Sequence, residues 1–269
     1  MNGQAALAVL RAESHVSVSA ITCYLQCPRA HEHRYILHTP PSHRSGALAF
    51  GSAMHTALAL LYRRLMEGQP EPSSAELEAA FADAWHRELG SSVPVLLDAA
   101  ETEDTALDRG VKLVRLFHAR AARPHRVVAA EEPFSVELCD PITGVVLDER
   151  LVGVFDAVVQ EGDSYQVLEH KTGARRWSQD RLAFDLQVSA YALAAPLMGF
   201  GQADVCIQLL LKTKEPALEL YHPFRAERDL QELLLTVTGV LVAAQARAFY
   251  PVRGWHCRGC PYAGPCLAG

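Results

Sequence analysis

The sequence contains no apolar run of the roughly 18 residues that a membrane-spanning helix requires. Its first residues, MNGQAALAVLRAESH, lack the long apolar segment and basic flank of a secretory signal peptide. Internal repeats, low-complexity tracts and helicase motifs are also missing. We therefore expect a cytoplasmic protein with no membrane partner. In that reducing compartment, clustered cysteines indicate metal or cluster ligands before disulfides.

An excess of positive charge is also absent. The 269 residues include 25 lysines and arginines against 31 aspartates and glutamates, so the formal net charge is −6. This balance argues against a uniformly basic nucleic-acid binder. It is compatible with a local basic groove, because electrostatic steering depends on how charge is distributed.

The composition is that of a globular protein, with 49% hydrophobic and 21% charged residues. Apolar periodicity predicts helices over residues 17–36 (broken near Cys27-Pro28), 46–67, 74–89 and 101–122. Three strands are predicted to follow as a meander, then a helix at about 178–197, a strand pair and a last helix over 226–249. We expect one α/β domain over 1–269, with a mainly helical portion (17–125), a sheet core holding the active site (126–225) and a C-terminal helix with a cysteine segment (226–269).

Three of the seven cysteines follow one another closely near the C-terminus, as Cys257, Cys260 and Cys266 in GWHCRGCPYAGPCLAG. Their C-x2-C-x5-C spacing suits a metal or cluster site, which usually takes four thiolates. An iron–sulfur cluster and a structural zinc ion both fit thiolate ligands, and a disulfide is the third interpretation. The remaining ligand must come from elsewhere in the chain.

Charged residues also occur in predicted strands in the middle of the chain, in GVFDAVVQEGDSYQVLEHKTG (153–173). Asp156 lies in one strand, and Glu169 and Lys171 share one face of the next. His170 points the other way and offers its backbone carbonyl to the carboxylates. Two carboxylates can hold Mg²⁺ or Mn²⁺, and a lysine can orient water or stabilise a charged transition state. An ordinary surface ion pair is the competing interpretation.

Two helices add polar groups. Gln187 and Tyr191 are four residues apart and share a helix face, where they can contact a phosphate or stack on a base. His55 lies on an otherwise small and apolar helix face. Taken alone, Tyr191 and His55 are more typical of core packing than of a site.

In this order, Gly51–His55 (G-x3-H), Gly153–Asp156 (G-x-x-D), Glu169–Gly173 (E-x-K-T-G) and Gln187–Tyr191 (Q-x3-Y) resemble the RecB-type branch of the PD-(D/E)XK nucleases. EEPFSVEL resembles the strand that precedes G-x-x-D in that family. The resemblance implies a restriction-endonuclease-like mixed sheet flanked by helices. It also implies a metal held by His55, Asp156, Glu169 and the carbonyl of His170, with Lys171 as the catalytic lysine. Gln187 and Tyr191 would support the active site or the DNA backbone.

The cysteines extend the resemblance. In the AddB-type nuclease and the RecB-like nucleases of CRISPR adaptation, one N-terminal and three C-terminal cysteines hold a [4Fe–4S] cluster. The matching residues here are Cys27, Cys257, Cys260 and Cys266, so the cluster would join the two ends of the chain. We expect Cys23 to be a buried free thiol, and Cys139 and Cys206 to be small core residues.

The resulting hypothesis is a Mg²⁺- or Mn²⁺-dependent deoxyribonuclease, an exonuclease on single-stranded DNA or DNA ends, acting in DNA repair, recombination or CRISPR adaptation. A helicase or another complex partner would supply any unwinding. Arg175, Arg176 and Arg181 with Trp177 can follow a DNA strand by charge and stacking, or they form an ordinary solvated helix start. The alternatives are a non-catalytic Fe–S subunit that binds DNA and a zinc-stapled hydrolase of another substrate.

Overall fold

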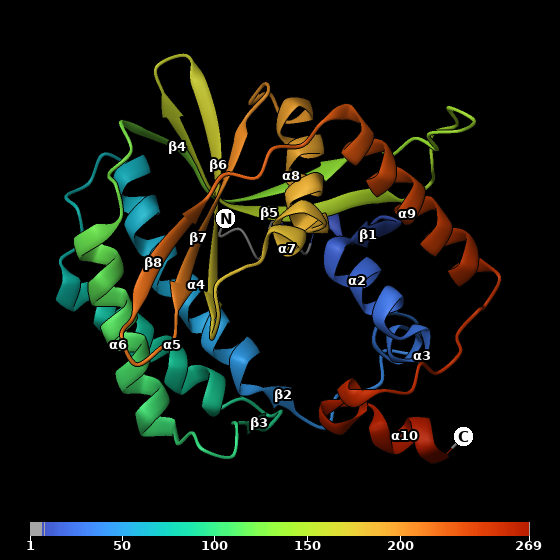
Figure 1. Ribbon diagram of the computed structural model, residues 1–269, viewed down its shortest axis with the longest axis horizontal. Coiled ribbons are helices and arrows are strands. Elements are labelled where there is room, and N and C mark those ends of the chain that lie inside the picture. The colour runs from blue at the N-terminus through green and yellow to red at the C-terminus, as the bar shows by residue number, and fades with distance from the viewer. Residues whose placement is uncertain (1–6, 8, 269) are drawn as a thin grey trace.

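The computed structural model describes residue 7 and residues 9–268. A six-stranded mixed sheet runs through the centre with helices on both faces (Figure 1). Its strands are β1 (His15–Ser17), β4 (Arg126–Val136), β5 (Arg150–Glu161), β6 (Ser164–Gly173), β7 (Asp204–Leu211) and β8 (Ala217–Tyr221). The mixed α/β fold predicted from the sequence is confirmed. None of the described helices is long and apolar enough to cross a membrane.

From β4 to β8, strands that follow one another in the chain are also neighbours in the sheet. β4, β5 and β6 are successive antiparallel neighbours, as predicted for a meander. β6 and β7 are parallel, because α7 (Gln179–Ala183) and α8 (Leu186–Leu197) carry the chain back along the sheet. β8 pairs with β7 antiparallel, and β1 runs parallel to the start of β5. β1 and the two-residue pair β2 (Arg44–Ser45) and β3 (Val95–Leu96) are too short to give a sequence pattern, and the sequence did not predict them.

Two hydrophobic cores lie on opposite faces of the sheet. One is formed under α4 (Gly46–Met66), α5 (Ser74–Leu89) and α6 (Glu103–Arg120), with Phe81 and Trp85 fully buried. The other lies under α2 (Val18–Gln26), α8 and α9 (Glu227–Gln245) and includes Phe134 and Phe155. The sheet is therefore sandwiched between helices, and its apolar side chains divide between the two cores.

Local signals set the helix boundaries. Ser45 caps α4 by accepting a hydrogen bond from Leu48 N, and Ser73 forms a capping box with Glu76 at the start of α5. The predicted break at Cys27-Pro28 separates α2 from α3 (Pro28–His31), and a π-helical turn (Glu32–Ile36) follows. The chain ends in a 3₁₀ turn (Trp255–Gly259) and α10 (Ala263–Ala268).

The single helix predicted over 178–197 is wrong, because the structure has two helices there. Phe184 ends α7, and Asp185 Oδ1 accepts hydrogen bonds from Gln187 N (3.0 Å) and Val188 N (3.2 Å). An aspartate that satisfies free N–H groups in this way begins a new helix. The break is important for the site, because it fixes where α8 starts and hence where Gln187 lies.

Candidate active site and cysteine cavity

Asp156 and Glu169 lie where two central strands separate. The β5–β6 ladder ends at Ala157 opposite Leu168, and this edge of β5 pairs instead with β1 at residues 150–152. Side chains then satisfy backbone groups that the ladder leaves free. The N–H of His170 donates to Asp156 Oδ2 at 2.8 Å, and the carbonyl oxygen of Val154 is 2.8 Å from the Tyr191 hydroxyl. We call the point where β5 and β6 separate the β5–β6 fork. It places polar side chains within an otherwise apolar sheet.

The two motif glycines have different surroundings. A Cβ on Gly153 would lie 2.3 Å from the Cζ atom of Phe134, its partner across the β4–β5 ladder. Glycine at this position therefore lets the Phe134 ring cover the strand that leads to Asp156. A Cβ on Gly51, one turn before His55, would meet no described atom within 4 Å. Packing explains the first glycine and does not explain the second.

Three residues from three elements converge at the fork. His55 Nδ1 on α4 is 3.1 Å from Asp156 Oδ1, and His170 Nδ1 on β6 is 3.2 Å from Asp156 Oδ2. One ligand atom from each lies within 4.8 Å of the others, so the group can hold a metal ion. The imidazole of His170 is a candidate ligand that the sequence interpretation missed, because it assigned His170 a backbone role alone. The ring packs against Tyr62, and its Nε2 is buried without a partner among the described residues.

A closed ring of polar contacts surrounds Glu169 and Lys171. Lys171 Nζ forms an ion pair with Glu169 Oε1 and donates a hydrogen bond to Gln187 Oε1 at 2.6 Å. Gln187 Nε2 donates to the Tyr191 hydroxyl at 2.7 Å, and that hydroxyl is 2.6 Å from Glu169 Oε2. The start of α8 thereby holds both members of the ion pair in place.

Charges at the fork shift the pKa values in opposite directions. Burial raises the pKa of Asp156, but His55 and His170 outweigh this effect and hold it well below its ordinary value. The negative charge of Asp156 raises the pKa of His55 to about 9. Burial, followed by the charge of Asp156, raises the pKa of Glu169 against the opposing effect of Lys171. Burial lowers the pKa of Lys171, yet Glu169 outweighs this effect and keeps it above the ordinary value.

We expect metal binding to displace a proton from His55. A histidine with a pKa of about 9 is protonated at pH 7.5, and a metal ligand must be neutral. The apparent affinity for Mn²⁺ should rise up to tenfold per pH unit between about 6.5 and 9 and then level off. Titration calorimetry in two buffers of different ionisation enthalpy counts the protons released. In His55→Gln the release should fall by about one proton, and equal release in both proteins would contradict the assignment.

The same raised pKa has a consequence for the metal-free protein. The folded-state pKa of His55 lies above its unfolded value of about 6.5, so its contribution to stability is complete below pH 6.5 and is lost as the pH rises through about 9. With EDTA present, the thermal midpoint should fall across this window in the native protein. The fall should be smaller in His55→Gln.

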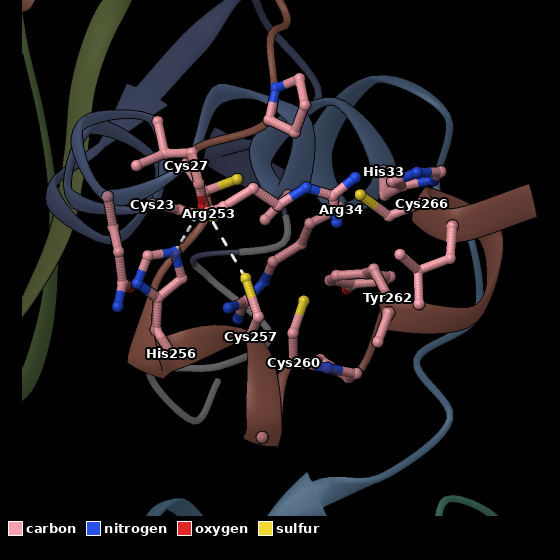
Figure 2. Close-up of a pocket in the computed structure, with 18 of the residues that line it drawn as sticks. Cys23, Cys27, His33, Arg34, Arg253, His256, Cys257, Cys260, Tyr262 and Cys266 are labelled. Carbon is pink, nitrogen blue, oxygen red and sulfur yellow. Dashed lines mark hydrogen bonds between the residues drawn. The ribbon is translucent and has the colours of Figure 1, made fainter. Parts of the chain in front are cut away.

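Five cysteines line one cavity of about 490 Å³ between the two ends of the chain (Figure 2). They are Cys23 and Cys27 from the N-terminal helices and Cys257, Cys260 and Cys266 from the C-terminal segment. Cys23 was expected to be a buried free thiol, but it is half-buried and lines the cavity. Cys206 is buried as predicted. Cys139 is exposed beside a turn, so its assignment to the core is wrong.

Hydrogen bonds to backbone carbonyls hold these two ends together. Arg29 N donates to the carbonyl of Tyr250 at 3.1 Å, and the Tyr24 hydroxyl donates to the carbonyl of Ala248 at 2.8 Å. Ser42 donates to the carbonyl of Pro261 through both its N–H (3.1 Å) and its hydroxyl (2.9 Å). The cysteine segment is therefore joined to the helices before β2 and to the linker that leads into α4 and His55.

The basic segment after β6 does not present the aromatic surface that the sequence interpretation considered. Trp177 is buried, and the Arg181 guanidinium lies 4.0 Å from the centroid of its ring. Arg176 is paired with Glu219 at 2.7 Å. Trp177 is therefore a core residue under a cation–π contact and cannot stack on a base in this conformation.

A family model described as the PD-(D/E)XK nuclease superfamily matches residues 15–267. No curated protein sequence matches the chain. Among solved structures, the protein SSO0001 is 14% identical, with 92% of this chain and 96% of that chain covered and a TM-score of 0.41. A candidate exonuclease from Eubacterium rectale is 13% identical, with 88% and 92% covered and a TM-score of 0.41. Rai1 of Scheffersomyces stipitis is 13% identical, with 88% and 68% covered and a TM-score of 0.28.

Proposed function

Because the chain belongs to the PD-(D/E)XK nuclease superfamily, we propose that it is a metal-dependent deoxyribonuclease that cleaves single-stranded DNA or DNA ends. The observation that carries the proposal is the β5–β6 fork. There the His55–Asp156–His170 group lies beside the Glu169–Lys171 ion pair. The ordered motifs support the RecB-type branch as its position in the superfamily, and they favour an exonuclease mode.

Protein ligands at the fork suit a divalent cation. His55, Asp156 and His170, with the Glu169 carboxylate on the adjoining strand, would hold it. Nitrogen and oxygen donors together suit Mn²⁺ better than Mg²⁺, which takes oxygen ligands almost alone. The bound ion would polarise a phosphate oxygen and lower the pKa of a bound water.

Lys171 provides a fixed positive charge beside the metal group. Its ion pair with Glu169 keeps it protonated, and Gln187 fixes the direction of its ammonium group. A charge held in this way stabilises the negative charge that develops on the phosphate without reorganising during the reaction. Gln187 and Tyr191 act as positioning residues, because Gln187 contacts Lys171 and Tyr191 contacts Glu169.

We further propose that Cys27, Cys257, Cys260 and Cys266 hold a [4Fe–4S] cluster. Four thiolates suit such a cluster or a single zinc ion. A zinc ion with bonds of about 2.3 Å needs sulfurs roughly 3.8 Å apart. Among the described residues, only the His55 group brings three potential ligand atoms within 4.8 Å of one another, so the thiols line a wider space. A wider space favours a cluster of several atoms over one ion.

The proposal is tested by digesting DNA labelled at one end. The substrates are single-stranded and double-stranded, with the 5′ end, the 3′ end or both ends blocked, in Mn²⁺, Mg²⁺ or EDTA. We expect metal-dependent cleavage that a blocked end suppresses, with Mn²⁺ more effective than Mg²⁺. Cleavage of single strands blocked at both ends would replace the exonuclease with an endonuclease. Absence of cleavage in both Mn²⁺ and Mg²⁺ would overturn the proposal that the protein is a nuclease.

A further inference from the structure

Positive charge is concentrated in two segments far apart in the sequence. Residues 246–269 contain Arg247, Arg253 and Arg258 and neither aspartate nor glutamate. Residues 33–66 contain four arginines and likewise no acidic residue. Since the whole chain has a net charge of −6, the rest of the molecule is strongly acidic. The cations are thus separated from the bulk of the anions along the chain.

The fold brings these two segments together. The carbonyls of Pro261 and Gly259 accept hydrogen bonds from Ser42 and the His43 ring, and the Tyr262 ring stacks on His33 at 5.8 Å between centroids. Arg34 and Arg253 both line the cysteine cavity (Figure 2). Arg44 before α4, and Arg63 and Arg64 in its last turn, pair with carboxylates of other elements. Among the described residues, Arg34, Arg253 and Arg258 form no ion pair with a carboxylate.

An exposed tryptophan lies between two of the free cations. Trp255 is 84% exposed, and Arg253 and Arg258 on either side of it are also exposed. The other two tryptophans, Trp85 and Trp177, are buried. An indole ring this exposed buries little apolar surface in the fold. The unpaired guanidinium groups beside it favour a polyanion with flat apolar rings over an apolar protein partner.

We propose that Arg253, Trp255 and Arg258 form a binding surface for single-stranded DNA next to the cysteine cavity. The arginines contact phosphates and Trp255 stacks on a base, as in other sequence-tolerant single-strand sites. This inference rests on the proposed nuclease function, because the strand bound here is the substrate. It gives the acidic chain a place to hold its polyanionic substrate away from the carboxylates of the fork.

The surface is tested with the full chain carrying Lys171→Met, in Mn²⁺, so that binding is measured without cleavage. Anisotropy of a fluorescent 20-nucleotide oligothymidylate reports affinity. Trp255→Ala should weaken binding about tenfold, and Arg253→Glu with Arg258→Glu should weaken it by more than tenfold and reduce the salt slope by about two. Because Trp255 is the exposed tryptophan, the oligonucleotide should also quench intrinsic fluorescence, and Trp255→Phe should abolish this quenching.

Two variants on another surface serve as matched controls. Phe224→Ala removes an aromatic ring that is 82% exposed, and Arg228→Glu reverses an exposed charge on α9. Both should bind the oligonucleotide like the parent. Parent-like affinity in Trp255→Ala and the double charge reversal, or equal losses in the controls, would overturn this surface and leave the nuclease proposal intact. If these variants lose affinity but the native protein does not cleave DNA, the nuclease proposal is overturned and the binding surface is not.

Discussion

Replacing Lys171 with methionine should lower the rate of DNA cleavage by about 10³-fold or more. The substitution keeps an unbranched side chain, one atom shorter, and removes the positive charge that lies beside the His55–Asp156–His170 group. It also removes the cation that opposes the rise in the pKa of Glu169, so this buried carboxyl should take up a proton and lose its capacity to bind a metal. Single-turnover cleavage of labelled single-stranded DNA in Mn²⁺ measures the loss.

The folded state should tolerate this change better than the activity does. Lys171 is partly exposed, and protonation of Glu169 avoids leaving a bare charge in the sheet, so the thermal midpoint should change by only a few degrees. Lys212→Met is the matched control, because Lys212 is also half-buried, lies over the Phe50 ring and contacts none of the fork residues. Activity of Lys171→Met within tenfold of the native protein would show that this lysine is not catalytic.

The second large effect concerns the cysteine cavity. Cys257→Ser should bleach a broad absorption near ~400 nm and lower the thermal midpoint by about 10–20 °C. The size of this effect follows because a link between the N-terminal helices and the C-terminal segment closes a loop of more than 200 residues. Both quantities are measured on anaerobically purified protein, by absorption spectroscopy and thermal unfolding.

Other cysteines of the chain separate the possible ligand sets. Cys139 is exposed and distant from the cavity in the chain, so Cys139→Ser should keep both the absorption and the thermal midpoint. Cys27→Ser should behave like Cys257→Ser, whereas Cys23→Ser should keep the cluster. Loss of absorption in Cys23→Ser with retention in Cys27→Ser would exchange their roles. A colourless native protein with one equivalent of zinc would contradict the cluster itself.

Helix and strand positions were largely readable from periodicity, since α4 and α5 match their predicted ranges within one residue. The prediction failed where a short polar signal overrides a long apolar pattern. Asp185 caps a new helix inside a stretch whose apolar residues recur at helical spacing, so one predicted helix is two. The prediction that Cys139 lies in the core failed for a related reason. The β-rich composition around it did not reveal that β4 ends at Val136.

By itself, the sequence determined the local relations of the site residues. Glu169 and Lys171 share a strand face because side chains alternate with period two, and Gln187 and Tyr191 share a helix face because a turn takes 3.6 residues. These spacings, and the ordered motifs, predicted which side chains could meet. They could not reveal that Trp177 is buried, or that the His170 ring turns toward Asp156.

Only the tertiary structure decided what lies between elements. The separation of β5 from β6 depends on β1 pairing with the start of β5, a contact between segments more than 130 residues apart. The cysteine cavity likewise depends on hydrogen bonds between the linker before α4 and the C-terminal segment. Such long-range contacts are set by how whole surfaces pack and not by the period of any one segment, so no local pattern in the sequence encodes them.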